Sequence, residues 1–493
     1  MKSNLAKAAY VIILLSSICH VWAQQNPAHR LELNLNEAIT LSIAKNYLVK
    51  TKSFSPALAK QAVIEEQGEF YPVLGLQLSN RDSDNLNAAG DTITSKEQED
   101  SSRLFVKGEM PWGTKYLLEV NDDRDETVNG SIAKSSDAQV LLEVKQPLLK
   151  GFGLNDRYAE ADLAKNKLKI QTWLFKDVVM DTVRDVIRAY ADLYFAKQNL
   201  EVAIKNRDLA SKLVEDNRKR VEVGRAAKSD IVNAEAGYAR REEAIIIAER
   251  LQRIQENRFK LLISDDIDAL IDYRIEIAAL PKPQPFDSDV LADFRQAMLL
   301  RPDYQAALLN VNGRQIELKR DKRRVLPELD LVLRYGLTGE ALGEDSAFGS
   351  LRDQRASTSY AGLNLSIPFP NRTNKAQLAA AELTLAREKI DIKKLKQAIL
   401  IDIDNAAARV LANWRRIEAT KKAQMFAERS LDAEEKLLRA GRSKSFFVLR
   451  LQEDLARAQI RQIQAVADYF KSLADYEYER GIILETYKVA VPD

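Results

Sequence analysis

Apolar residues along this chain follow two different periods, one helical and one extended. The helical period predicts short amphipathic helices at 34–49 and at about 55–70, the second ending before Pro72. From Val73 the period changes to two, which is typical of a strand with one apolar face. The same change from helix to strand occurs again near Pro327.

Alternation of apolar and polar residues predicts at least two strands in each half of the chain. Each strand is about as long as the roughly 10 residues with which a barrel strand crosses a bilayer. Polar loops rich in turn residues are expected between the strands, at 81–99 and 338–357. The first half also contains a hairpin, 104–110 with 116–120, that has no counterpart in the second half. The alternating apolar residues are Leu74, Leu76, Leu78, Val140, Leu142, Val144, Leu329, Leu331, Leu333, Tyr335, Ala361, Leu363, Leu365 and Ile367.

Two stretches without glycine or proline, 154–223 and 372–440, dominate the rest of the chain. At about 1.5 Å per residue each would form a helix of roughly 100 Å, much longer than the helices of globular domains. Gly224 and Gly441 end these stretches, and helix-forming sequence then continues to about residues 263 and 480. The sequence therefore predicts two long helical hairpins.

An internal duplication relates the two halves. A shift of 255 residues places Tyr71 and Pro72 on Leu326 and Pro327 without a gap, and repeats of this kind decide the fold class. The predicted boundaries are repeat 1 at 24–263 (short helices 35–70, strands and loops 71–147, hairpin 154–263), a linker at 264–289, repeat 2 at 290–484 (short helices 290–326, strands 327–368, hairpin 372–481) and a tail at 485–493.

The N-terminus has the features of a secretory signal peptide at 1–23: two lysines, an apolar run and small residues before a cleavage site after Ala23. Lipidation at Cys19 is a weaker alternative, because Ile18 stands where a small residue would be needed. The processed chain would carry 72 basic and 72 acidic residues, no cysteine, and His29 as its single histidine. This composition excludes catalysis by a Cys or His nucleophile and any thiolate or multi-His metal site, and it indicates no cofactor.

The predicted pieces need partners. Four strands cannot close a barrel, since single-chain bacterial barrels need at least eight, and open edges in lipid leave backbone groups unpaired. Long helical hairpins with an apolar stripe also require lateral neighbours. A ring of identical protomers satisfies both requirements.

The order of short helices, strands and long hairpin, repeated once behind a signal peptide, resembles the TolC-type outer-membrane efflux channels. The marks of this resemblance are the two helix-to-strand junctions at 71–74 and 326–329, the paired hairpin tips, and the run Gln146 to Gly153, which resembles one subgroup. The resemblance implies a mainly α-helical homotrimer whose α-barrel reaches into the periplasm and whose twelve-stranded β-barrel spans the outer membrane of a Gram-negative-type envelope. The extra hairpin departs from this pattern, and it would either widen the barrel or lie at its mouth.

The resemblance also implies a function, a passive conduit that is not an enzyme. Its partners would be a periplasmic adaptor (membrane fusion protein) and the inner-membrane pump of a tripartite efflux or type I secretion system, while the cargo stays open. The expected adaptor-docking tips are Gly224, Arg225, Ala226, Ala227, Lys228, Ser229, Gly441, Arg442, Ser443, Lys444 and Ser445. A simpler interpretation of Gly224 and Gly441 is that they are ordinary helix C-caps.

The periplasmic aperture is expected at Asp230, Phe447 and Arg450. The family carries acidic rings at the last two positions, so that Phe447 would form an apolar constriction and Arg450 would repel cations. A channel with weaker cation selectivity is the resulting hypothesis. The alternative is that Phe447 packs within its hairpin and Arg450 is only solvated, while Asp230 lies next to Ser229, which can cap the return helix.

Three other patterns favour different functions less strongly. Gly151-Phe152-Gly153 is half of a dinucleotide fingerprint but fits a strand-exit loop better, and the basic run 319–324 would suit nucleic acid but fits a solvated helix end near the periplasmic rim of the barrel better. Acidic pairs such as Asp402 with Asp404 would suit a glycosidase, but without a pocket they are ordinary charges on long helix faces. A soluble periplasmic coiled-coil adaptor or scaffold is the main alternative function, and an enzyme comes third. The soluble alternative does not need tyrosines near strand ends, where aromatic residues of membrane interfaces lie: Tyr71, Tyr116, Tyr335 and Tyr360.

Overall fold

The structure is a computed structural model, and it describes residues 30–86, 93–128, 132–153, 158–342, 347–353 and 356–491. The expected signal peptide with Cys19, and His29, lie outside these residues. Two compact units are formed, one from 30–50, 178–297 and 402–491, the other from 51–177 and 298–401 with the gaps given above. Each unit therefore combines segments of both repeats.

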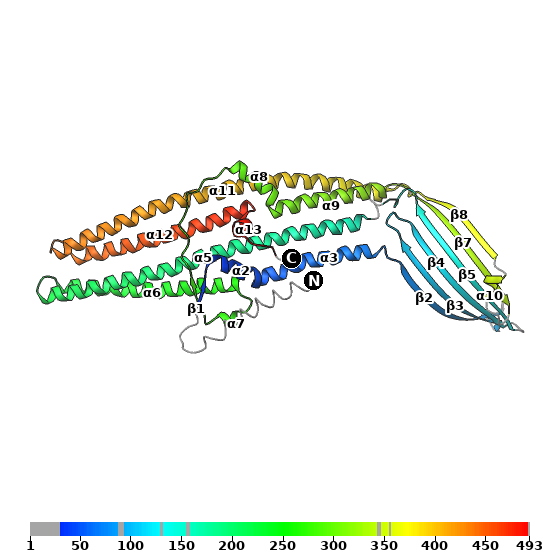
Figure 1. Cartoon of the computed structure of the whole chain (residues 1–493), viewed down its shortest axis with the longest axis horizontal. Helices are drawn as coiled ribbons and strands as arrows, with labels where there is room; N and C mark the ends of the chain where they lie inside the picture. The colour runs from blue at the N-terminus through cyan, green and yellow to red at the C-terminus, as the bar shows by residue number, and fades with distance from the viewer. Residues whose placement is uncertain are drawn as a thin grey trace, which may run out of the picture. The chain divides into compact units, whose positions relative to one another are not determined.

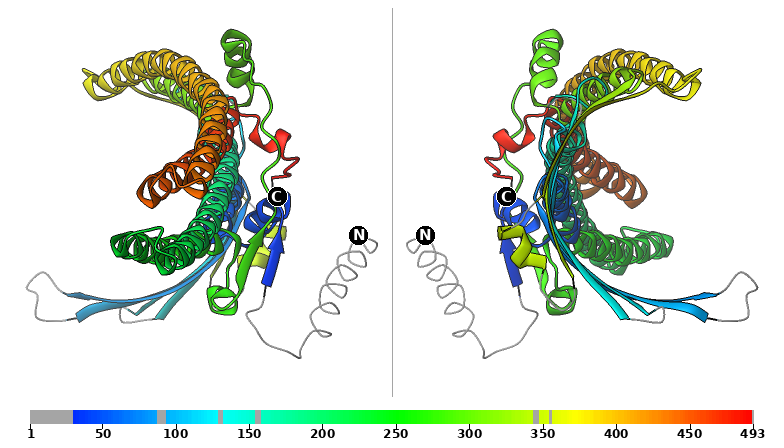
Figure 2. Two further views of the ribbon diagram at one scale, coloured as in Figure 1. Left: turned by 90° about the vertical axis from the view of Figure 1, so that its left-hand side faces the viewer. Right: turned by 90° about the vertical axis from the view of Figure 1, so that its right-hand side faces the viewer.

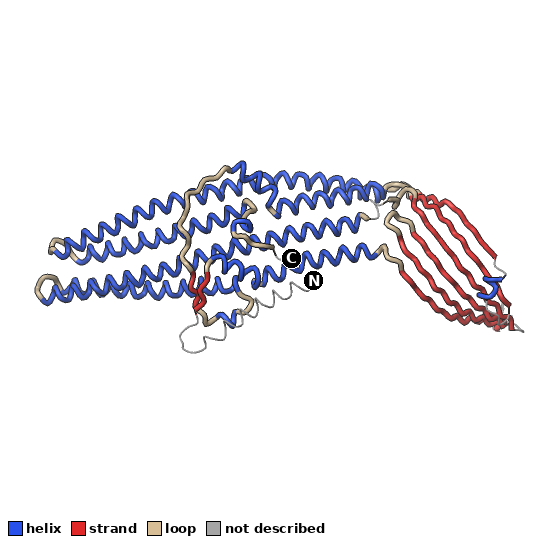
Figure 3. Tube along the Cα trace, in the orientation of Figure 1, coloured by secondary structure: helices blue, strands red, loops and turns tan. Residues whose placement is uncertain are grey.

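The four longest helices of the described residues form two hairpins, which Figures 1 and 3 show as adjacent pairs of helices joined by short turns. α5 (Ala159–Glu222) returns as α6 (Lys228–Ile263), and α11 (Arg372–Arg439) returns as α12 (Ser445–Glu479). In α12 the heptad-like positions Val448, Leu455, Tyr469 and Tyr476 are buried, which confirms the apolar stripe expected there. Among the described residues, no helix is both long and apolar enough to cross a membrane.

Short elements of the first unit pack against these helices. α2 (Leu35–Lys45) and α8 (Val290–Leu300) are equivalent short helices of the two repeats. β1 (Arg30–Leu33) pairs in parallel with β6 (Arg274–Ile277). The expected linker thus contains a strand and the short helix α7 (Ile267–Leu270). Tyr190 of α5 donates a hydrogen bond to the carbonyl of Ala278 (2.8 Å), which fixes the chain just after β6.

The repeat is accurate at the level of single residues. α3 (Tyr47–Gly68) and α9 (Pro302–Arg324) begin 255 residues apart, as do α2 and α8. The break between the short helices falls at Asn46 and not after residue 49 as predicted. Asn46 adopts an extended ψ of 126° and its side-chain oxygen accepts from the backbone N–H of Leu48 (2.8 Å), so that a new helix starts there.

The second unit contains one six-stranded antiparallel sheet. Its strands, in spatial order, are β2 (Val73–Leu86), β3 (Ile93–Glu109), β4 (Lys115–Val128), β5 (Ile132–Pro147), β7 (Glu328–Leu342) and β8 (Ala356–Ser366). The hairpin left open by the sequence is therefore β3–β4, which lies inside the sheet between β2 and β5. Figure 2 shows that this sheet is curved.

One face of the sheet is apolar across all six strands. Cross-strand pairs such as Leu76 with Leu104, Leu118 with Leu142, and Leu331 with Leu363 lie on it. Many of these side chains are exposed, among them Leu76 at 67% and Leu363 at 65%. The opposite face is polar and carries ion pairs, including Arg334 Nε to Glu143 Oε2 and Lys145 Nζ to Asp330 Oδ2 (2.7 Å).

The strands are longer than the sequence predicts. Much of 81–99, expected as a loop, belongs to β2 and β3, and the segment 338–342 belongs to β7. The prediction was wrong because alternation appears only where one face is apolar, whereas here both faces are polar. Pairs such as Arg81 with Glu99 (3.6 Å) and Asn80 with Asp100 (2.7 Å) replace apolar contacts in this part of the sheet.

Candidate docking tips and channel wall

The two hairpin tips use the same turn. Gly224 has a φ of +73° and Gly441 a φ of +74°. Residues with a β-carbon rarely adopt such positive φ angles. The N–H of Arg225 donates to the carbonyl of Arg220 (2.7 Å), and the N–H of Arg442 donates to that of Leu437 (2.9 Å). Both glycines therefore end their helices in the left-handed cap described for helix C-termini.

The helix that returns from the first tip has no hydroxyl cap. Ala227 occupies the cap position of α6, and its N–H donates to the carboxylate of Asp230 (3.3 Å). Capping by Ser229, considered from the sequence, is wrong because the helix already begins at Lys228. Asp230 thus lies at the N-terminal end of α6, where a negative charge is favourable.

Most of the expected docking residues are exposed. The tips display Arg225, Lys228, Arg442 and Lys444 to solvent, while Ala226 and Ser443 are half-buried. Ser445 is buried at 4% exposure, and its hydroxyl donates to the Asn217 side chain of the first hairpin (2.6 Å). Ser445 therefore joins the hairpins, and the surface left for a partner carries four cationic side chains.

Further hydrogen bonds connect the hairpins near their tips. Arg220 of α5 donates to the carbonyl of Leu438 in α11 (2.7 Å). A cluster of buried apolar side chains supports this contact: Leu213, Leu431, Leu438, Val448, Leu449 and Leu455. The two tips are thus held as one body in this conformation.

Arg241 of α6 was not identified from the sequence, although it is the most deeply buried cation of the tip region, with 4% exposure. Its guanidinium donates to the carbonyl of Leu449 (3.2 Å), to the side chain of Gln452 (3.4 Å) and to that of Asn206 (3.2 Å). Burial lowers its pKa, and Arg240 contributes to the same direction. The available signal was Gly237 one turn earlier, where a β-carbon would lie 3.0 Å from Leu449 and where α6 and α12 approach closely.

The expected aperture residues are exposed in the protomer. Phe447 is 48% exposed and packs edge-on against Phe446, with ring centroids 5.6 Å apart. Arg450 is exposed, and Asp230 is half-buried beside its cap. Packing within one hairpin does not cover Phe447, so its place in an aperture remains a prediction.

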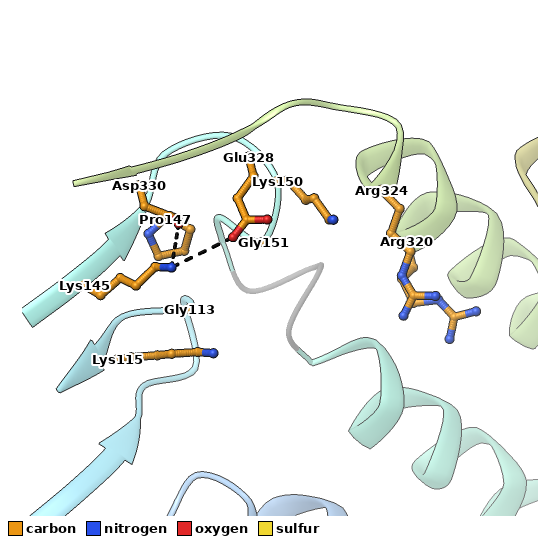
Figure 4. Close-up of a pocket in the computed structure, with 10 residues that line it drawn as sticks. All are labelled: Gly113, Lys115, Lys145, Pro147, Lys150, Gly151, Arg320, Arg324, Glu328 and Asp330. Carbon is orange, nitrogen blue, oxygen red and sulfur yellow. Dashed lines mark ion pairs between the residues drawn. The ribbon is translucent and has the colours of Figure 1, made fainter. Parts of the chain in front are cut away.

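A basic cavity of about 330 Å³ lies at the polar face of the sheet in the second unit (Figure 4). Five of its ten lining residues are cations, namely Lys115, Lys145, Lys150, Arg320 and Arg324, against two carboxylates, Glu328 and Asp330. Figure 4 shows Lys145 paired with both carboxylates, while Arg320 and Arg324 reach the cavity from α9. Two residues of the basic run 319–324 therefore line this cavity, and one of them, Arg320, also forms an ion pair with Glu160 (2.5 Å).

The turn of the β3–β4 hairpin, residues 110–114, forms one wall of this cavity. A β-carbon on Gly113 would lie 2.3 Å from the carbonyl oxygen of Gly151, so only glycine permits this approach. The N–H of Gly153 donates to the carbonyl of Trp112 (3.1 Å). Gly151 and Gly153 are therefore turn residues against which the hairpin packs, and the strand before them, β5, is antiparallel to both of its neighbours, unlike the parallel strand that precedes a dinucleotide fingerprint.

Comparison with known proteins links this chain to a protein family. Residues 294–475 match the family described as outer membrane efflux protein. The outer membrane efflux protein BepC of Brucella suis is 23% identical over 328 residues, which are 66% of this chain and 68% of that protein. Residues 294–475 therefore belong to the outer membrane efflux protein family.

Solved structures share the fold of this chain. The outer membrane channel CmeC of Campylobacter jejuni superposes with a TM-score of 0.67 at 13% identity, covering 91% of this chain and 86% of that one. The outer membrane protein VceC of Vibrio cholerae gives 0.65 at 16% identity, with 91% and 96% covered. These matches confirm the mainly helical fold with antiparallel strands, and the family match agrees with the predicted outer-membrane efflux channel.

The remaining alternatives from the sequence receive no support from the site. Among the described residues, no group of three or more His, Cys, Asp and Glu side chains is arranged to hold a metal ion. Asp402 and Asp404 are both exposed on α11. The candidate functional features are thus the tips, the apolar face of the sheet and the basic cavity.

Proposed function

We propose that three copies of this chain form a passive conduit that receives cargo from an inner-membrane pump and its periplasmic adaptor. The observation that carries the proposal is a six-stranded sheet with an apolar band on one face and, among the described residues, no strand paired to its outer edges, in the same chain as two long hairpins with matching tips. A wall of this kind needs lipid on one face and further copies at its edges. The soluble adaptor alternative explains the hairpins but not the apolar sheet face.

The tips are the proposed docking surface. Arg225, Lys228, Arg442 and Lys444 project from two turns that Gly224 and Gly441 hold in one shape. An adaptor surface with acidic side chains or helix C-terminal carbonyls would complement them. Ser445 and Asn217 position the tips and do not contact the partner.

The aperture proposal follows from the exposed pair Phe446 and Phe447 and from Arg450. If Phe447 and Arg450 face the channel axis, three copies would place an apolar constriction beside three positive charges. Planar-bilayer recordings would then show weak cation preference. Strong cation preference with tight block by trivalent cations would contradict this part of the proposal.

A photo-crosslinking experiment tests the docking proposal. A benzophenone amino acid replaces Arg442 at the tip or, as the matched control, Lys421, which is exposed on α11 of the same unit. We expect the Arg442 variant to form an adduct with a periplasmic adaptor in intact cells and the Lys421 variant to form none. Equal adducts from both positions, or recovery of the protein in the soluble periplasm without detergent, would contradict the proposal.

A further inference from the structure

We infer that the β3–β4 hairpin is part of the membrane wall, so that three chains close a barrel of eighteen strands and not the twelve that the family resemblance implies. The inference rests on the proposed trimer, since three sheets of six strands give this number. It also concerns a feature that one repeat has and the other lacks.

The register shows that the hairpin is paired on both sides. β3 pairs with β2 from Val73 and Lys107 to Leu86 and Ile93, with one irregularity near the end. β4 pairs with β5 from Lys115 and Lys145 to Val128 and Ile132 without a shift. A hairpin that lay at the mouth or inside the lumen would leave β2 next to β5, whereas here these strands are separated by two others.

The hairpin carries its own share of the apolar face. Leu104 lies opposite Leu76 of β2, and Leu118 lies opposite Leu142 of β5, so both belong to the face that runs across the whole sheet. Leu104 and Leu118 are 49% and 46% exposed, which leaves them available to lipid. A hairpin surrounded by water would have no reason to carry this stripe, because exposed apolar patches are rare on soluble surfaces.

The opposite face of the hairpin carries a charged pair. Arg103 of β3 forms an ion pair with Glu119 of β4, and Glu119 is 6% exposed. The ring of Phe105 covers Gly75 of β2, where an added β-carbon would lie 2.3 Å from the ring. The Arg103 guanidinium lies 5.4 Å from the centre of the same ring. The two faces of the hairpin therefore match those of its neighbours.

The turn of the hairpin, residues 110–114, is held against the end of β5. Met110 and Gly113 form a tight turn through the Gly113 N–H and Met110 carbonyl (2.8 Å), and Thr114 donates to the side chain of Gln146. Together with the contact between Gly113 and Gly151, this holds the turn against the strand exit. The hairpin is thus paired with β2 and β5 along its length and held at its turn by the end of β5.

The edges of the sheet fit a second copy of this chain. Within the described residues β2 pairs only with β3 and β8 only with β7, and unpaired backbone groups in lipid cost several kcal/mol each. The six strands alternate in direction, so the two edge strands, β2 and β8, run in opposite directions. β8 of one copy can therefore pair antiparallel with β2 of the next copy. An even total of eighteen strands agrees with bacterial single-chain barrels, and the diameter would exceed that of twelve strands by about one half.

A deletion variant tests the width directly. Residues 87–131 are replaced by Asn-Gly, which joins β2 to β5 by a two-residue turn and pairs Leu86 with Ile132. This register places Leu74 opposite Val144, so the apolar faces stay aligned. In planar bilayers, with graded polyethylene glycols added on the extracellular side, we expect the full chain to admit larger polymers than the deletion variant does. Equal cut-offs for two trimeric proteins would overturn the inference.

A second measurement does not depend on the folding of the deletion variant. The processed chain has no cysteine, so Leu118→Cys and its neighbour Leu117→Cys can each carry a single bimane label. In vesicles containing brominated lipid, we expect quenching at position 118 and none at 117. Absence of quenching at 118 in a trimeric, membrane-inserted protein would overturn the inference. A protein that is not trimeric by native mass measurement would instead overturn the proposed function on which the inference rests.

Discussion

The two repeats build nearly identical hairpins but different amounts of sheet. α6 and α12 contain 36 and 35 residues, and the tip glycines differ by 1° in φ. In the sheet, repeat 1 contributes four strands and repeat 2 contributes two. The difference shows which part of the molecule tolerates insertion: a hairpin added to an antiparallel sheet brings its own partner strand and returns the chain to the same end. Helices that must reach a common docking level have no such freedom.

The largest expected effect comes from a charge placed on the lipid face of the inserted hairpin. Leu118→Arg should cost about 2–4 kcal/mol and strongly reduce assembly in the outer membrane. Leu363→Arg makes the same change on repeat 2 and should have a comparable effect if both strands line the wall. The yield of membrane-inserted trimer on native gels measures the effect.

Leu117→Arg is the control for this prediction, because Leu117 lies on the polar face opposite Glu143. It should leave assembly nearly unchanged. If Leu118→Arg is tolerated while Leu363→Arg is not, the hairpin is not part of the wall. Repeat 1 would then contribute no more strands to the wall than repeat 2.

The next effect distinguishes two buried carboxylates on the return helices. Glu256 of α6 pairs with Lys260 (3.4 Å) and accepts from the N–H of Ile275 (2.8 Å), whereas Oε2 of Glu477 in α12 has no hydrogen-bond partner among the described residues. Burial raises the pKa of Glu477 to about 7, against an opposing effect of Arg480. Because the folded protein holds this proton more tightly than the unfolded one, stability should fall between about pH 4.5 and 7, by roughly 3 kcal/mol at most, and then level off.

Glu477→Gln should remove this part of the pH dependence. Thermal unfolding in detergent at pH 5 and pH 8 measures it, and the difference in Tm between the two pH values should be smaller for the variant than for the original chain. An unchanged difference would show that Glu477 is hydrated or paired in the assembled protein.

A smaller effect is expected from loosening the contact between the hairpins. Arg241→Met keeps the volume of the side chain but removes its donors to Leu449, Gln452 and Asn206, at about 2 kcal/mol. We expect a higher open probability in planar-bilayer recordings. Arg240→Met is the control, since Arg240 is exposed and its carboxylate partner Glu453 is 4.0 Å away. Equal behaviour of the two variants would argue against Arg241 as a contact that holds the tips.

The smallest effect should be shared by the two tips. Gly224→Ala and Gly441→Ala each place a β-carbon on a residue with positive φ and should each cost about 1 kcal/mol. Neither glycine has a neighbour within 4 Å of the added β-carbon, so the cost is conformational and should be similar at both sites. Chemical denaturation of the two variants compares them, and a difference above about 1 kcal/mol would show that the tips are not equivalent.

The sequence predicted those features that depend on periodicity and on glycine. The 255-residue shift, the long hairpins and the caps at Gly224 and Gly441 follow from local chemistry, and the structure shows them. The polar ends of β2 and β3 escaped prediction because their partners, such as Arg81 and Glu99, are identified only by cross-strand register. Arg241 escaped for the same reason, since its acceptors are a backbone carbonyl and side chains from two other helices.

The place of the β3–β4 hairpin in the wall is the central claim of this account, and an electron cryo-microscopy reconstruction of the full-length protein in detergent or nanodiscs tests it most directly. The account predicts a trimer whose barrel contains eighteen strands, six from each chain, with β8 of one chain beside β2 of the next. A trimeric barrel of twelve strands, with β3 and β4 in the lumen or outside the membrane, would contradict it.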